Sequence, residues 1–196
     1  MKRLRQIALV ATVLVAACTS VGERTQLSVA YYSISGESFA ELDQQIALHG
    51  PTVTGVGKAL AATNIRMVPD FRFAMRGSQC EVVSTLVSVK AHVTLPRLAS
   101  QQRLRQKLSK AWNNLEQYAR LHESIHVSIA DGYAVRAEEE IRALESEPSC
   151  EALREKAIAH FRSLMVEHER DQLQFDLEER VRIANIVRRT QEQDLQ

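Results

Sequence analysis

The fold of this chain is decided by residues 108–133, LSKAWNNLEQYARLHESIHVSIADGY. Apolar residues recur there at steps of three and four, the period of an amphipathic helix with one face turned toward a core. His122 and His126 fall on this apolar face, one turn apart, rather than on the solvated side. The inward stripe consists of Leu108, Ala111, Leu115, Ala119, His122, His126, Ile129 and Tyr133.

The sequence His122-Glu123-Ser124-Ile125-His126 has the HExxH spacing of zinc sites. On a helix, two imidazoles four residues apart can bind one ion, and the carboxylate beside the first can take a proton from an attacking water. We therefore predict that His122 and His126 bind zinc and that Glu123 is the catalytic base. The alternative is a pair of core histidines that bond to the backbone or to carboxylates.

The N-terminus has the features of an export signal. Basic residues at positions 2, 3 and 5 precede an apolar run, residues 7–17, that is too short to span a bilayer. Residues 15–18, VAAC, resemble the lipobox of bacterial lipoproteins, which implies cleavage before Cys18 and a diacylglycerol on its sulfur. Because Thr19 follows the cysteine, the resemblance implies an anchor in the outer membrane, with the protein facing the periplasm. The alternatives are an ordinary signal peptide and a short buried helix.

Length and charge limit the organisation of the mature chain. The sequence has 196 residues with 25 basic and 24 acidic side chains, a net charge of +1. This balance gives no reason to expect a nucleic acid partner. We predict a lipoprotein signal peptide at 1–17, a lipidated tether at 18–26, a single domain at 27–187 and a polar tail at 188–196.

The three cysteines divide into one lipid attachment site and one even pair. If Cys18 carries lipid in an oxidising compartment, Cys80 and Cys150 are left to form a disulfide. The alternative, two buried thiols, holds only if the chain is not exported.

The remaining patterns predict an α+β fold. Alternating apolar residues at 65–75 and 83–95, with a β-prone cluster at 27–35, predict a small antiparallel sheet with one wet face. Pro69 indicates an edge strand or a bulge, and Ser38 and Glu41 form the capping box of a short helix. Helical patterns at 100–144 and from 151 to beyond 180, separated by Pro148, predict a long two-helix C-terminal hairpin that packs on the sheet, with HExxH on its first helix.

An unbroken helix over 100–144 would be about 68 Å long, which is too long for a compact domain of this size. We therefore expect a bend or break at the weakest helix formers, Asn113-Asn114 or Asp131-Gly132.

The third zinc ligand is left open by this pattern. Glu138, Glu139 and Glu140 would serve only if the helix breaks near residue 132, and a solvated face paired with nearby arginines is the simpler interpretation. A hairpin that turns at residue 148 instead brings His168 and Asp176 level with HExxH, and spacing alone does not separate these two.

Several short motifs of this chain occur together in one bacterial family. They are residues 31–36, YYSISG, residues 49–51, HGP, Leu95-Pro96 after the strand entered at Cys80, Trp112 ten residues before HExxH, Cys150, and Phe175-Asp176. With them the chain resembles bacterial secreted proteins predicted to be zinc-dependent proteases, a domain of unknown function that contains HExxH. The resemblance covers most of the mature chain and implies a zincin-like α+β fold and peptidase activity.

The chain departs from this family near its C-terminal end. The family pattern there is Tyr-Asp-x-x-Thr-x-His-Gly, whereas residues 175–182 are FDLEERVR and lack the threonine, histidine and glycine. The Phe175-Asp176 match favours Asp176 over His168 as the third ligand. If the histidine binds zinc in relatives, this chain uses another ligand or has lost catalysis.

The expected activity is hydrolysis of peptide bonds by a zinc-activated water, with one zinc ion and a peptide or protein substrate in the cell envelope. Tyr118, Tyr133 and His160 are candidates for the proton donor, and a sheet edge could bind an extended peptide as an added strand. The alternative is a non-catalytic envelope lipoprotein that acts as a binding or structural module.

Overall fold

The computed structural model of the chain describes residues 24–54, 56–99 and 106–194. The predicted signal peptide and most of the tether, including Cys18, lie outside these residues. Among the described residues, no helix combines the length and apolar character needed to cross a membrane.

The main sheet contains three strands in the order β1-β5-β4. They are β1 (Thr25–Ile34), β4 (Ala62–Arg76) and β5 (Gln79–Leu98). β4 pairs antiparallel with β5 through a short turn, but β1 pairs with β5 in the parallel direction. The prediction of an antiparallel sheet is therefore wrong, and the sheet is mixed. Alternation of apolar residues defines a buried face but carries no information on strand direction, and the long connection from β1 to β4 allows the parallel pairing.

The two long strands follow their predicted faces except near the turn that joins them, where Met75 of β4 is 51% exposed. Val87 and Val89 of β5 are fully buried, whereas Val83, which continues the same alternation, is 47% exposed. Arg72 of β4 pairs with Ser84 and Phe73 with Val82, so Val83 is the extra residue of a bulge in β5, which explains the reversal. Pro69 lies on the edge strand β4, as expected. A proline is tolerated there because the outer edge of β4 pairs with no other strand of this sheet.

A short connecting region joins β1 to β4. It contains α1 (Phe39–His49) and a two-stranded sheet of β2 (Thr52–Val53) and β3 (Gly57–Lys58). The hydroxyl of Ser38 accepts the N–H of Glu41, which confirms the predicted helix start. Leu42 of α1 packs with Ile34, Leu108 and Trp112 at one end of the molecule.

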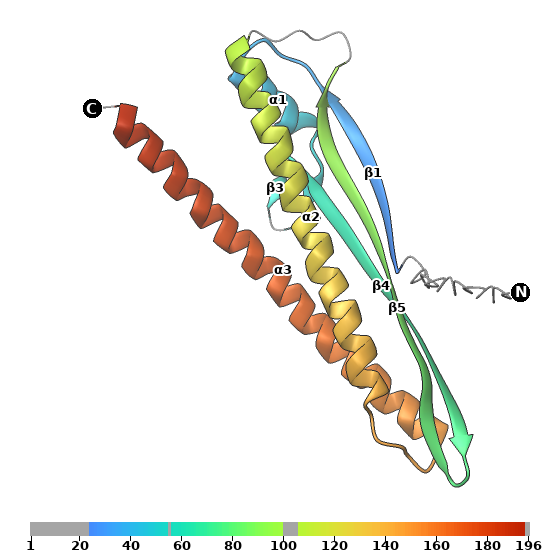
Figure 1. Cartoon of the computed structure of the whole chain (residues 1–196). Coiled ribbons are helices and arrows are strands. Elements are labelled where there is room, and N and C mark those ends of the chain that lie inside the picture. Colours follow the sequence, from blue (N-terminus) through green and yellow to red (C-terminus); the bar gives the residue numbers. More distant parts are fainter. Residues whose placement is uncertain (1–23, 55, 100–105, 195–196) are drawn as a thin grey trace, which may run out of the picture.

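Two long helices form the predicted C-terminal pair. The first lies along one face of the sheet, whereas the second packs there with its initial part and then diverges (Figure 1). They are α2 (Gln106–Arg142) and α3 (Cys150–Asp194), and α2 lies along β4 and β5 (Figure 1). The expected break in α2 is absent. A helix of 37 residues is about 55 Å long and a strand of 20 residues about 66 Å, so the elongated sheet supports the whole helix.

The main core lies between this sheet and the two helices. It contains Val87 and Val89 of β5, Ala134 and Ile141 of α2, and Leu164 of α3, with other apolar side chains around them. Cys80 at the start of β5 and Cys150 at the start of α3 form the predicted disulfide. The chain is thereby closed at the end of the sheet where α2 turns into α3.

Candidate metal centre

His122, His126 and Asp176 form the one group of three potential metal ligands found among the described residues. The Oδ1 atom of Asp176 lies 3.2 Å from Nε2 of His122 and 3.0 Å from Nε2 of His126. The two Nε2 atoms are 3.1 Å apart. We call these three atoms the donor triangle.

The donor triangle has the dimensions of a zinc site. Zinc–ligand distances near 2.0–2.1 Å place neighbouring ligands of a tetrahedral site about 3.3 Å apart. The observed separations of 3.0 to 3.2 Å are close to this value. The side chain of Asp176 is 41% exposed and those of His122 and His126 are 19% and 13% exposed. One side of the triangle is therefore open to solvent, as a catalytic site with a free fourth position requires.

The helical spacing and one aromatic ring position the two imidazoles. His122 and His126 lie on consecutive turns of α2, on the side that faces α3. The ring of Phe175 packs against both, with centroid distances of 4.9 Å to His122 and 5.0 Å to His126. The adjacent Asp176 brings its carboxylate to the same point, so the Phe175-Asp176 pair acts as a unit.

Gln172 fixes the orientation of His126. Its Oε1 accepts a hydrogen bond from Nδ1 of His126, and its Nε2 donates to the carbonyl oxygen of the same residue at 3.0 Å. With the proton on Nδ1, the Nε2 atom is free to bind a metal. A hairpin that turns at residue 148 places Gln172 level with HExxH. No pattern in the sequence predicts the two hydrogen bonds between Gln172 and His126.

His168, the alternative third ligand, lies outside the donor triangle. Its Nε2 accepts the second N–H of the Gln172 amide at 2.8 Å, and its ring packs on Tyr133. Burial lowers the pKa of His168, which favours the neutral ring that accepts this bond. His168 thus supports Gln172, which in turn holds His126.

His122 has no comparable support. Its Nδ1 is the buried side-chain atom without a hydrogen-bond partner among the residues that the structure describes. A hydrogen bond to Gln172 therefore fixes the tautomer of His126, whereas no hydrogen bond among the described residues fixes that of His122.

Glu123 lies on the sheet side of α2 rather than in the donor triangle. Its side chain is buried, with a residue exposure of 4%, and its Oε2 accepts the hydroxyl of Thr63 on β4 at 2.6 Å. Among the described residues its Oε1 has no hydrogen-bond partner, so this oxygen is available for a proton.

Of the three candidate proton donors, Tyr118 lies beside the triangle. Its ring centroid is 6.0 Å from that of His122, and its hydroxyl donates to Glu179 at 3.1 Å. Burial and the Glu179 carboxylate raise the pKa of Tyr118 to about 12. Tyr133 donates to Asp171, and His160 pairs with Glu140 on the flank of the helix pair.

The acidic run in α2 is divided between two environments. Glu140 pairs with Arg136 at 2.6 Å, as expected of a solvated helix face. The same expectation is wrong for Glu138, which is 7% exposed and binds Arg24 and the N–H of Val87. None of the residues 138–140 belongs to the donor triangle.

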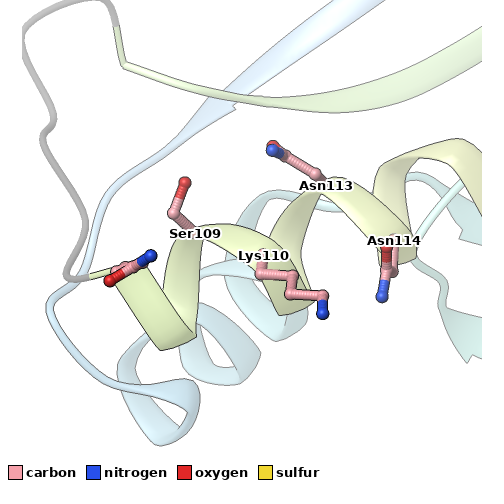
Figure 2. Close-up of a pocket in the computed structure, with 5 residues that line it drawn as sticks. Ser109, Lys110, Asn113 and Asn114 are labelled. Atoms are coloured by element: carbon pink, nitrogen blue, oxygen red, sulfur yellow. The ribbon is translucent and has the colours of Figure 1, made fainter.

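A polar hollow of about 480 Å³ lies along the first turns of α2, away from HExxH. In Figure 2 the labelled side chains of Ser109, Lys110, Asn113 and Asn114 spread outward from the helix instead of converging on one point. This hollow is an open surface and does not form part of the centre.

A family model described as a bacterial protein of unknown function, DUF922, matches residues 29–182. The chain belongs to the DUF922 family. The match extends from β1 through the donor triangle and ends within α3, so the centre lies inside the DUF922 region. No curated protein and no solved structure matches the chain.

The matched region ends with residues 175–182, where the chain departs from the pattern expected from the resemblance. Glu179, Val181 and Arg182 occupy the positions of the threonine, histidine and glycine. Val181 is 62% exposed, and Arg182 donates two bonds of 2.6 Å to Glu179, which lowers the pKa of that carboxyl. Asp176 is the residue of α3 that reaches the two histidines.

Proposed function

We propose that this DUF922 protein is a zinc metallopeptidase of the bacterial cell envelope. The observation that carries the proposal is the donor triangle of His122, His126 and Asp176, which has the size and the open side of a catalytic zinc site. A bound zinc ion would supply polarisation of a peptide carbonyl and a lowered pKa of water. The proposed substrate is a peptide or protein of the envelope.

In this proposal Glu123 takes the proton of the attacking water. The hydrogen bond from Thr63 holds Oε2, and Oε1, which has no hydrogen-bond partner among the described residues, would take the proton. Tyr118 remains protonated at neutral pH because its pKa is about 12, so it can donate to the oxygen of the carbonyl under attack.

The sheet offers a place for the substrate backbone. β4 is an edge strand, and Thr63 near its start contacts Glu123. We propose that an extended peptide adds to this edge near residue 63, where main-chain hydrogen bonds would place the scissile bond close to the donor triangle.

A non-catalytic envelope lipoprotein that binds a partner or a structural metal is the second candidate. Two observations favour it: Glu123 is 4% exposed, and the C-terminal threonine, histidine and glycine of the resembled family are replaced here. If water does not reach Glu123, this residue cannot act as the base, and the centre would bind a metal without hydrolysing a substrate.

The test compares Glu123→Gln with Glu139→Gln, an exposed carboxylate on the same helix. For each purified protein, zinc content is measured by elemental analysis, and cleavage is measured on a peptide library. The peptidase proposal predicts one zinc per chain in both variants and loss of cleavage only in Glu123→Gln. Zinc binding without cleavage in the unaltered protein would establish the binding module instead.

The envelope location rests on the proposed lipid at Cys18. Intact mass analysis of the membrane-extracted protein should show a chain that begins at Cys18 with acyl chains attached. A mature N-terminus at another residue, or a chain that begins at Cys18 without acyl chains, would contradict the lipoprotein proposal.

A further inference from the structure

The outward face of the sheet carries two cations side by side. Lys90 of β5 is in register with Arg66 of β4 and with Gln26 of β1, and all three side chains are exposed. In-register partners point to the same side of a sheet, and the neighbouring Val89 and Ala91 point to the buried side. The cations therefore face away from α2 and α3.

The next row of the sheet adds further polar groups. His92 is in register with Ser28 and Asn64, and its Nδ1 lies 2.9 Å from the hydroxyl of Ser28. Both rows line one surface hollow of about 360 Å³. We call these side chains the outer patch, which consists of Gln26, Ser28, Asn64, Arg66, Lys90 and His92.

The described part of the chain supplies no counterion for the two cations of the outer patch. Like charges directly opposite on neighbouring strands destabilise a sheet. Among the described residues, neither Arg66 nor Lys90 forms an ion pair. Asp70 lies further along the same face of β4, but it is already paired with Arg72 at 3.3 Å. An anion bound between the two cations would relieve their repulsion.

We infer that the outer patch binds the phosphate groups of anionic phospholipids, so that the outward face of the sheet lies on the membrane. Gln26 is eight residues from Cys18, and eight residues span at most about 29 Å. A lipid on Cys18 would therefore keep the outer patch close to the headgroups, where even a weak site for phosphate is filled.

This orientation also suits the metal centre. The donor triangle lies between α2 and α3, and α2 lies along the opposite face of the sheet (Figure 1). With the outer patch on the membrane, the open side of the centre would remain accessible to proteins in the surrounding water. The inference uses the proposed lipid anchor, but it does not depend on zinc binding or on cleavage.

The test measures how fast the amine of Lys90 reacts with an acylating reagent. The full-length protein is inserted through its N-terminus into discs of phosphatidylcholine, with or without phosphatidylglycerol, and acylation of each lysine is followed by peptide mass analysis. We expect Lys90 to react about threefold or more slowly in the anionic discs. Lys110, an exposed lysine on α2, is the internal reference and should be unaffected.

Two variants make the test specific. Arg66→Gln should remove the protection of Lys90, whereas Arg76→Gln, an exposed arginine at the far end of the same strand, should retain it. The comparison of the two lipids on the unaltered protein needs no variant, so a misfolded variant would not obscure it. Intact mass of the same sample shows whether Cys18 carries lipid, which separates failure of the anchor from failure of the outer patch.

Three results would overturn the inference. They are equal reactivity of Lys90 in both kinds of disc, equal protection of Lys90 and Lys110, and protection by added inorganic phosphate but not by the anionic lipid. The last result would assign the outer patch to a free anion instead of the membrane.

Discussion

Gln172 of α3 binds His126 of α2 through both ends of its amide. The oxygen accepts a hydrogen bond from Nδ1 of the imidazole, and the nitrogen donates one to the main-chain carbonyl of the same residue. The two helices are thus joined at the point where the donor triangle requires a fixed ring. We expect this contact to control metal affinity without touching the metal.

Replacing Gln172 by alanine should weaken zinc binding by roughly 10- to 100-fold, because His126 would lose its tautomer and its orientation. Competition with a chromogenic chelator measures the affinity. Gln174→Ala is the matched control, since Gln174 is exposed on the same helix and bonds only to Glu178 in the described structure. Equal affinity in both variants would show that Gln172 has no positioning role.

The identity of the third ligand can be decided by a pair of substitutions. Asp176→Asn should reduce zinc affinity by more than the roughly 100-fold expected for loss of a supporting residue, because it removes a charged donor atom. His168→Gln should have the smaller effect, since His168 contacts Gln172 and not the triangle. The same chelator titration compares them, and the reverse order of effects would assign the ligand to His168.

The sequence predicts those features that depend on the position of a residue within one element. The i, i+4 spacing places His122 and His126 on one face of α2, and the turn near Pro148 brings Asp176 to the same level. Features that depend on contacts between two elements cannot be predicted from such patterns within one element. The parallel pairing of β1 and the amide bridge of Gln172 are of this kind.

The unbroken course of α2, where the sequence predicts a break, has a related cause. A break in α2 is expected only if the domain is compact, because the helix is longer than the diameter of such a domain. The strands β4 and β5 form a long ribbon, and Ala130, Ala134 and Ala137 pack along it without a gap. The alternation in residues 83–95 predicts a strand, but only the full length of β5, Gln79–Leu98, shows that the domain is elongated.

The disulfide should stabilise the end of the molecule where α2 turns into α3. Cys80 and Cys150 are 70 residues apart, and closing a loop of this size stabilises the fold by about 4 kcal/mol in the chain-entropy model. Urea unfolding of the oxidised protein and of a Cys80→Ala/Cys150→Ala variant measures the difference. A change below about 1 kcal/mol would show that the hairpin is held without the bond.

The buried carboxylate of Glu138 should anchor the start of the sheet. It accepts two bonds from Arg24, at 3.2 and 2.8 Å, and a third at 2.8 Å from the main-chain N–H of Val87 in β5. Replacement by alanine would leave this buried N–H unpaired and the guanidinium without a partner, at a cost of about 2 to 3 kcal/mol.

Glu139→Ala is the control for this prediction, because Glu139 is adjacent on α2 but exposed. Its effect on urea unfolding should be below about 0.5 kcal/mol. Arg24→Ala should cost less than Glu138→Ala, since the arginine side chain is 25% exposed and the bond to Val87 survives its removal. Equal losses for Arg24→Ala and Glu138→Ala would show that the ion pair, and not the bond to β5, is the source of the stability.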